Sequence, residues 1–190
     1  MEERQITVDG VTTVLDEPFM VMATQNPIES YGTFPLPEAQ TDRFFMRISL
    51  GYMTREQELG VIARPSTLAI INELETVVSP EETEYVRNHF NEVRVSPEMA
   101  GYMMDIIERT RSDSRFLAGV STRGAIALYK ASQVTAAMNG REYVIPEDIL
   151  FVAKPVLCHR ITFGGNLRTS DAEIAFRKAI EDLPVPLEGK

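Results

Sequence analysis

The stretch from Phe19 to Tyr52 constrains the fold of this chain more than any other. An apolar run, Phe19 to Ala23, follows Pro18 and precedes polar residues, which is typical of a strand buried on both faces. The run ends at Asn26, where the following proline prevents a paired strand from continuing. Because ligands of open α/β sheets bind at the carboxyl ends of strands, we expect the Asn26 carboxamide to lie at a ligand site.

A loop, a short helix and a second strand are predicted next. Three prolines and Gly32 indicate a loop of fixed course. Pro37 is then expected to begin a short helix, since proline is tolerated in a first turn. Asp42 and Arg43 would lie at the end of this helix, and the apolar residues from Phe44 to Leu50 predict the second strand.

Three runs in this stretch carry a family resemblance: A-T-Q-N-P-I-E, G-T-F-P-L-P-E-A-Q-T-D-R-F and R-I-S-L-G-Y. Together they resemble the MoxR family of AAA+ ATPases. The resemblance implies that Asn26 is sensor 1, which orients the water that attacks the γ-phosphate. It also implies that Arg43 is the arginine finger, which reaches a neighbouring subunit's nucleotide site. The planar, permanently charged guanidinium of arginine suits that role.

Each of these residues also has a purely structural interpretation. An Asn before Pro is usually a turn residue, and an Arg in D-R-F is usually part of an ion pair at a helix end. Isolated motifs are weak signals. The order and spacing of the two residues within one matching run favour the functional interpretation.

A second segment, G-V-S-T-R-G-A-I-A-L-Y-K-A-S-Q-V-T-A-A-M-N-G-R-E-Y-V-I-P-E-D-I, resembles the helical lid of the same family. It implies that Arg123 is sensor 2, which contacts the nucleotide phosphates from the lid. An Arg in a first helical turn is disfavoured by the helix dipole, so an anion nearby is expected. The alternative is a surface Arg tethered to Asp113 or Asp148. Gly124 departs from the family pattern and costs up to about 1 kcal/mol relative to Ala, which predicts close packing there.

The remaining elements are predicted from local signals. Asp9-Gly10 predicts a type I′ hairpin over residues 4 to 17. Helices are expected to follow caps or start signals at Thr54, Ser79, Ser96, Ser121, Pro146 and Ser170. Spacings of three and four predict that Met99, Met103, Ile106 and Ile107 share a buried face. The other methionines of this region, Met104 and Met138, are also expected to pack in the core.

The chain contains no G-x-x-x-x-G-K-[ST] loop, the motif that cradles nucleotide phosphates. The run T-T-V-L-D-E resembles a Walker B strand, but only about ten residues separate Asp16 from Asn26, too few for a parallel crossover. We therefore interpret Asp16-Glu17-Pro18 as a turn between antiparallel strands. The chain is expected to be the later part of an ATPase module, with the nucleotide-binding part upstream, and to be inactive alone.

Composition limits the other possible functions. A formal charge of −9 and a pI near 4.8 argue against broad nucleic-acid binding, which needs a basic face. The basic residues Arg109, Arg111 and Arg115 are expected to form a solvated helix end. Cys158 is the only cysteine and is expected to be a small buried residue; with two histidines, no zinc site is predicted. No apolar stretch could span a bilayer, and a cytoplasmic setting is expected.

The predicted fold class is α+β and mainly α. A partial AAA+ α/β core with a β-hairpin, residues 1–65, would be followed by connecting helices and an α-helical lid, residues 66–190. The resemblance implies an intact protein that binds and hydrolyses ATP with Mg²⁺ as a ring, expected to be a hexamer. It would remodel client proteins in a chaperone-like role, with partners that carry von Willebrand A-type domains. The alternatives are a AAA+ motor of the metal-chelatase or nucleic-acid-acting type, and a non-enzymatic helical binding module.

Overall fold

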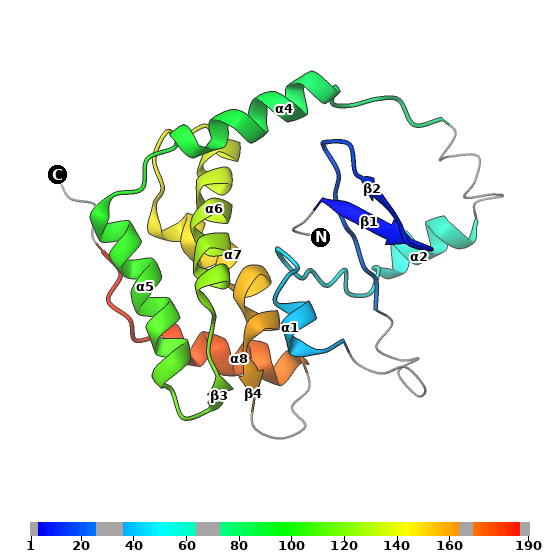
Figure 1. The fold of residues 1–190 in the computed structure, drawn as a ribbon. Helices are drawn as coiled ribbons and strands as arrows, with labels where there is room; N and C mark the ends of the chain where they lie inside the picture. The colour runs from blue at the N-terminus through cyan, green and yellow to red at the C-terminus, as the bar shows by residue number, and fades with distance from the viewer. Residues whose placement is uncertain (1–3, 26–35, 64–72, 164–168, 187–190) are drawn as a thin grey trace.

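The computed structural model describes residues 4–25, 36–63, 73–163 and 169–186 of the 190-residue chain. It is mainly α, with two small antiparallel sheets, as predicted. A bundle of helices lies on one side of the molecule and the N-terminal hairpin on the other, with α1 between them (Figure 1). The elements before the bundle are β1 (Gln5–Val8), β2 (Val11–Val14), α1 (Glu38–Thr41), α2 (Arg55–Ile62), α4 (Pro80–His89) and η1 (Phe90–Glu92). The bundle contains α5 (Pro97–Ser112), β3 (Phe116–Ala118), α6 (Thr122–Met138), α7 (Pro146–Leu157), η2 (Cys158–Arg160), β4 (Thr162–Phe163) and α8 (Thr169–Ile180).

The predicted hairpin is confirmed. β1 pairs with β2 in antiparallel register, with Val8 opposite Val11. The two turn residues, Asp9 and Gly10, have φ values of 50° and 78°, and positive φ at both central residues defines a type I′ turn. All residues of both strands are exposed, including four large apolar side chains, Ile6, Val8, Val11 and Val14.

The two predicted apolar strands are wrong for this chain. Residues 19–23 and 44–50 form no strand, and Met20 and Met22 are 79% and 81% exposed. A strand requires a second strand that pairs with its N–H and C=O groups, and no described strand pairs with either segment. Arg47 instead donates its backbone N–H to the carbonyl of Pro155, which lies within α7.

The predicted helix starts are largely confirmed, because each depends on residues close in sequence. Thr54 and Ser79 form complete capping boxes, and Ser96 and Ser121 accept bonds from the first turns of their helices. Gly140, with φ of 70°, follows the end of α6. Helix α8 begins at Thr169, one residue before the start predicted from Ser170, and the Ser170 side chain lies outside the described part of the chain.

The hydrophobic core lies within the bundle. Four residues, Ile106, Ile107, Leu128 and Ile149, are fully buried between α5, α6 and α7. Among the described residues, none before Val93 is buried. The methionine prediction holds for Met99 and Met103 and is wrong for Met104 and Met138, which are exposed. Met104 follows Met103 on the helix and therefore points about 100° away from the core face.

A buried ion pair fixes the start of α7. Asp148 is 2% exposed, and its carboxylate accepts two bonds from the Arg141 guanidinium, at 2.6 and 2.5 Å. The same carboxylate accepts the backbone N–H of Ile145 at 3.0 Å, as a cap for the helix. The loop between α6 and α7 is thus held to the first turn of α7 by a single side chain.

Candidate functional site

The candidate site is built around Asp42, the residue that follows α1. A tight turn places it there, since Arg43 N–H bonds to the carbonyl of Gln40 and Phe44 N–H bonds to that of Thr41. The Asp42 carboxylate faces the N-terminus of α6. It accepts bonds from the Ser121 hydroxyl at 3.1 Å, from Arg123 Nη1 at 3.0 Å and from Arg160 Nη1 at 2.9 Å. We call these four residues the Asp42 cluster.

Arg160 is the buried member of the Asp42 cluster. Its side chain is 1% exposed, and sequence reasoning did not identify it as a functional residue. Nη1 donates to the backbone carbonyl of Asp42 at 2.5 Å, and Nη2 donates to the carbonyl of Phe44 at 2.6 Å. Nε donates to the carbonyl of Val156 at 2.9 Å. The one available signal was a guanidinium directly after an apolar helix, because a buried charge must be paired.

Gly124 makes room for this arrangement. A Cβ at Gly124 would lie 3.0 Å from Cδ of Arg160 and 2.4 Å from Cγ1 of Val120. The close packing predicted at Gly124 is therefore confirmed, and the neighbours that require it are the Val120 side chain and the stem of Arg160.

The electrostatics keep Asp42 ionised. Burial alone would raise the pKa of this carboxyl, but the hydrogen bonds from Arg160, Arg123 and Ser121, with the charge of Arg160, outweigh burial and hold the pKa below its ordinary value. The next residue, Arg43, has an exposed side chain. With Arg43 included, three guanidiniums accompany one carboxylate, and this formal excess of positive charge suits an anionic ligand.

His159 and Cys158 are not candidate catalytic groups. Nε2 of the His159 ring donates to the carbonyl of Phe44 at 3.0 Å, so Nε2 carries the proton. Burial lowers the pKa of His159, and the charges of Arg160 and Arg47 act in the same direction. Burial raises the pKa of the Cys158 thiol to about 12, so this thiol is inert. Among the described residues, no group of three potential ligands could hold a metal ion.

The structure places two of the three predicted site residues. Arg123 lies in the first turn of α6, and its tether to Asp42 corrects the alternative of Asp113 or Asp148, which pair with Arg115 and Arg141 instead. Asp42 therefore links Arg123 to the segment that carries Arg43. Asn26 lies outside the described residues, so a site shared by Asn26 and Arg123 stays a prediction.

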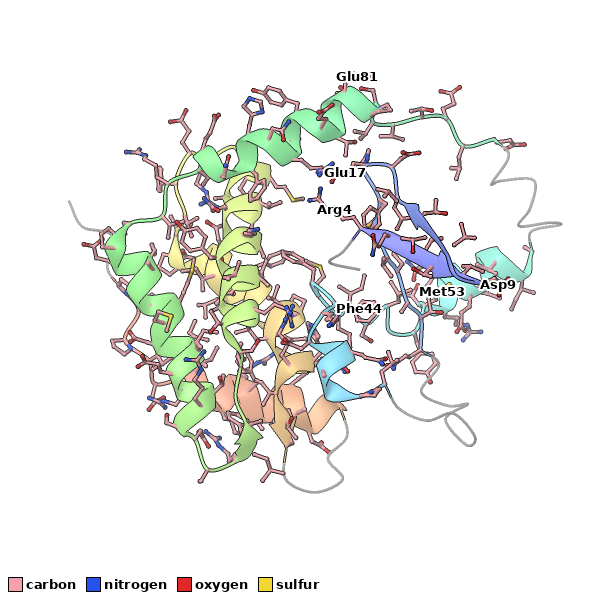
Figure 2. All side chains as sticks on the ribbon, in the orientation of Figure 1. Arg4, Asp9, Glu17, Phe44, Met53 and Glu81 are labelled. Atoms are coloured by element: carbon pink, nitrogen blue, oxygen red, sulfur yellow. The ribbon has the colours of Figure 1, made fainter. Side chains whose placement is uncertain are left out.

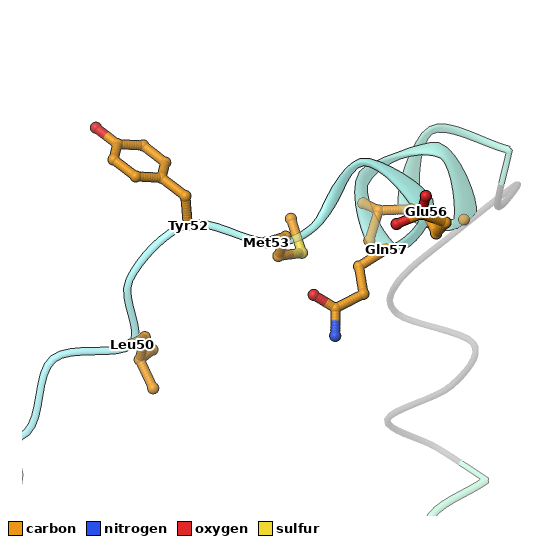
Figure 3. Close-up of a pocket in the computed structure, with 7 residues that line it drawn as sticks. Leu50, Tyr52, Met53, Glu56 and Gln57 are labelled. Carbon is orange, nitrogen blue, oxygen red and sulfur yellow. The ribbon is translucent and has the colours of Figure 1, made fainter.

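Other surface features offer weaker candidates. The basic residues near the end of α5 have partners within the chain: Arg109 bonds to Asp182, Arg111 to the carbonyl of Val120, and Arg115 to Asp113. The hollow drawn in Figure 3 is lined by Leu50, Tyr52, Met53, Glu56, Gln57, Gly60 and Val61. It is open and includes no member of the Asp42 cluster. No helix in the described ranges is long and apolar enough to cross a membrane.

Comparison with known proteins yields two family-model matches, one near the N-terminus of the chain and one in the helical bundle. Residues 1–46 match the model described as "ATPase family associated with various cellular activities (AAA)". Residues 108–180 match the model described as "AAA lid domain". The first match includes Asp42 and Arg43, and the second includes Arg123 and Arg160, so the Asp42 cluster joins the two matched regions.

Individual relatives agree with these matches. The chain is 39% identical to the uncharacterized protein YeaC of Bacillus subtilis, over 99% of this chain and 59% of YeaC. It is 31% identical to chaperone MoxR1 of Mycobacterium tuberculosis, over 98% of this chain and 52% of MoxR1. A crystal structure from Cytophaga hutchinsonii, described as a candidate ATPase, superposes with a TM-score of 0.83 at 36% identity, over 98% of this chain and 60% of that one.

The chain thus spans between about half and three fifths of the length of the relatives it matches. Two further relatives, from Paracoccus denitrificans and Methylorubrum extorquens, are each named MoxR. The family models, these names and the shared fold agree on one family. In sequence and in fold, this chain belongs to the MoxR family of AAA+ ATPases.

Proposed function

We propose that this chain is the sensor, finger and lid part of an intact protein that binds and hydrolyses ATP with Mg²⁺. In this proposal the boundary between the core remnant and the lid region lies near residue 65. A nucleotide-binding segment outside this chain supplies the phosphate-binding loop and the residues that hold Mg²⁺. The chain alone does not hydrolyse ATP.

One observation carries the proposal: Arg123, a member of the Asp42 cluster, and Arg43, the residue that follows Asp42, both have exposed side chains. The Arg43 side chain is exposed to solvent, directly after Asp42 in the chain. The Arg123 side chain is 45% exposed while paired with Asp42. Guanidiniums at a surface fit phosphate oxygens, which they bind through paired N–H donors. In the proposed reaction, Arg43 stabilises the charge of the transferring phosphoryl group in a neighbouring subunit.

The other two predicted residues complete the proposed site. Asn26 orients the attacking water, and Arg123 contacts phosphates from the lid. The Asp42 carboxylate carries one negative charge, and a triphosphate carries more, so the nucleotide can compete for Arg123. Since the proposed arginine finger acts from an adjacent subunit, the proposed assembly is a ring, for which we propose six subunits.

We further propose a chaperone-like role in which nucleotide-driven lid motion remodels client proteins. The name of the M. tuberculosis relative, chaperone MoxR1, supports this role. Partners that carry von Willebrand A-type domains are the proposed clients.

The experiment is the Arg43→Ala substitution in the intact protein, with ATP hydrolysis and ATP binding measured separately. We expect kcat to fall by about 10³-fold or more, the range found for arginine fingers, while the Kd for ATP changes little. Arg115→Ala is the matched control, because Arg115 is also a surface arginine and it bonds to Asp113, which is not part of the Asp42 cluster. Unchanged hydrolysis in the Arg43→Ala protein would refute the proposed role of Arg43, and an inactive wild-type protein would refute the ATPase.

A further inference from the structure

The segment that carries Arg43 is attached to the helical bundle by backbone contacts. We define residues 42–47 as the finger segment. We propose that Arg160 is a positioning residue that fixes the finger segment to the lid, so that Arg43 and the lid move as one body. This inference rests on the proposed ATPase function and adds a residue to it.

Arg160 holds the backbone of the finger segment, and not only its side chains. Its guanidinium donates to the main-chain carbonyls of Asp42, Phe44 and Phe45, the last at 3.3 Å, and to the Asp42 carboxylate. Charge-assisted bonds to several points of one segment fix its position and its direction. Phe44, whose carbonyl accepts bonds from His159 and Arg160 of η2, lies beside α1 in Figure 2.

Neighbouring residues of the bundle reinforce this attachment. His159 Nε2 bonds to the carbonyl of Phe44 at 3.0 Å, and the carbonyl of Pro155 accepts the N–H of Arg47 at 2.8 Å. Arg160 is itself fixed within the lid, by its Nε bond to Val156 and by the close approach of its stem to Gly124 in α6. The finger segment is therefore bonded at both ends to α7 and η2.

The N-terminal hairpin side has a weaker link to the helices. Glu17, which follows β2, pairs with Arg4 and with Arg87 of α4 (Figure 2). All three side chains are at least 36% exposed, and exposed ion pairs contribute about 0–1 kcal/mol. A change of angle between lid and core would therefore break this link before it broke the bonds of Arg160.

Such a rigid unit would connect the sites of adjacent subunits. A change in lid angle in one subunit would displace its Arg43 in the neighbour's site. A misplacement of about 1 Å can reduce a rate by about 100-fold, so a small rotation of the lid is enough to switch hydrolysis next door.

The test is Arg160→Lys in the intact protein. Lysine keeps the positive charge beside Asp42 but lacks the planar fork, so it cannot bond to all the carbonyls of the finger segment. We expect kcat for ATP hydrolysis to fall by about 10- to 100-fold, with KM within about twofold, because Arg43 acts on the transition state. Arg115→Lys is the control, since Arg115 also makes a two-bond contact with a carboxylate, and its kcat should match that of wild type.

A second readout measures the attachment itself and needs no ATPase activity. The chain contains no tryptophan, so Phe45→Trp places a single tryptophan in the finger segment of this 190-residue chain, and its emission can be excited apart from that of the six tyrosines. We expect its fluorescence anisotropy to fall when Arg160→Lys is added and to stay unchanged with Arg115→Lys. If Arg160→Lys loses its helical circular dichroism spectrum, Asp42→Asn, which preserves side-chain shape, is used in both assays with the same expectations.

The outcomes separate this inference from the function it rests on. An active wild type that loses activity with Arg43→Ala but keeps its kcat with Arg160→Lys would overturn the positioning role alone. Unchanged anisotropy of the tryptophan would overturn it as well. If the wild type does not hydrolyse ATP but Arg160→Lys still reduces the anisotropy of the introduced tryptophan, the attachment by Arg160 stands and the proposed ATPase function is refuted.

Discussion

The ion pair at the start of α7 allows a quantitative test of the bundle. Asp148→Ala removes a carboxylate that is 2% exposed and accepts two bonds from Arg141 and one from the N–H of Ile145. The substitution leaves the guanidinium without its partner and the helix without its cap. Both losses occur at the loop that joins α6 to α7.

The expected loss of stability can be worked from these contacts. Removing a helix cap costs about 0.5–2 kcal/mol. Breaking a buried ion pair costs about 3–5 kcal/mol, but the Arg141 side chain is 23% exposed and can regain some hydration. We therefore expect the free energy of unfolding to fall by about 3 kcal/mol, between the cap loss and the full buried-pair loss.

The measurement is urea unfolding followed by helical circular dichroism. At a slope of about 1–3 kcal/mol per M, the expected loss lowers the urea midpoint by about 1–3 M with the slope unchanged. Glu147→Ala is the control, because Glu147 is an exposed acidic residue in the same helical turn, and it should change stability by less than about 0.5 kcal/mol. Equal losses in the two variants would refute the assignment of stability to the Asp148 carboxylate.

Two further predictions concern packing and pH. Gly119→Ala should destabilise the bundle by about 1–3 kcal/mol, since its Cβ would lie 2.5 Å from the carbonyl oxygen of Thr110. Gly101→Ala, where a Cβ within α5 would meet no neighbouring atom, should stabilise the bundle by about 0.4–1 kcal/mol. A thermal unfolding experiment in which the Gly119→Ala protein is the more stable of the two would contradict this reasoning. The pKa of His159 in the folded chain is lowered from 6.5. As the pH falls, the unfolded chain therefore binds a proton at His159 before the folded chain does. The contribution of His159 to the free energy of unfolding is thus fully present above about pH 6.5 and is lost as the pH falls below it. His159→Gln should flatten that pH dependence in urea titrations, and an unaltered profile would exclude His159 as its source.

The sequence predicted best what depends on residues a few positions apart. The capping boxes at Thr54 and Ser79 and the Asp9-Gly10 turn were predictable because each partner lies within three residues in sequence. Arg160 was missed because its partner Asp42 is 118 residues away, and nothing near Arg160 in sequence indicates that pairing. Strands at residues 19–23 and 44–50 were predicted from apolar content alone, but a strand forms only where another strand pairs with it.

The family resemblance added what spacing could not supply. It singled out Arg43 and Arg123: the structure bonds Arg123 to the Asp42 carboxylate, and Arg43 is the residue that follows Asp42. The structural alternative had been that Asp113 or Asp148 tethers Arg123. Asp42 accepts that bond across 81 residues, and only the folded chain brings the two together.

The two-stranded ribbon formed by β1 and β2 packs against none of the core that the structure describes, and this affects which part of the chain an unfolding experiment reports on. Two-stranded ribbons are marginal in water unless something apolar covers one face, and here every ribbon residue is exposed. Its amides should exchange with solvent far sooner than those of α5, α6 and α7, which enclose the core. A midpoint of unfolding therefore belongs to the bundle, and protection appearing at residues 5–14 would directly register that another apolar surface has docked there.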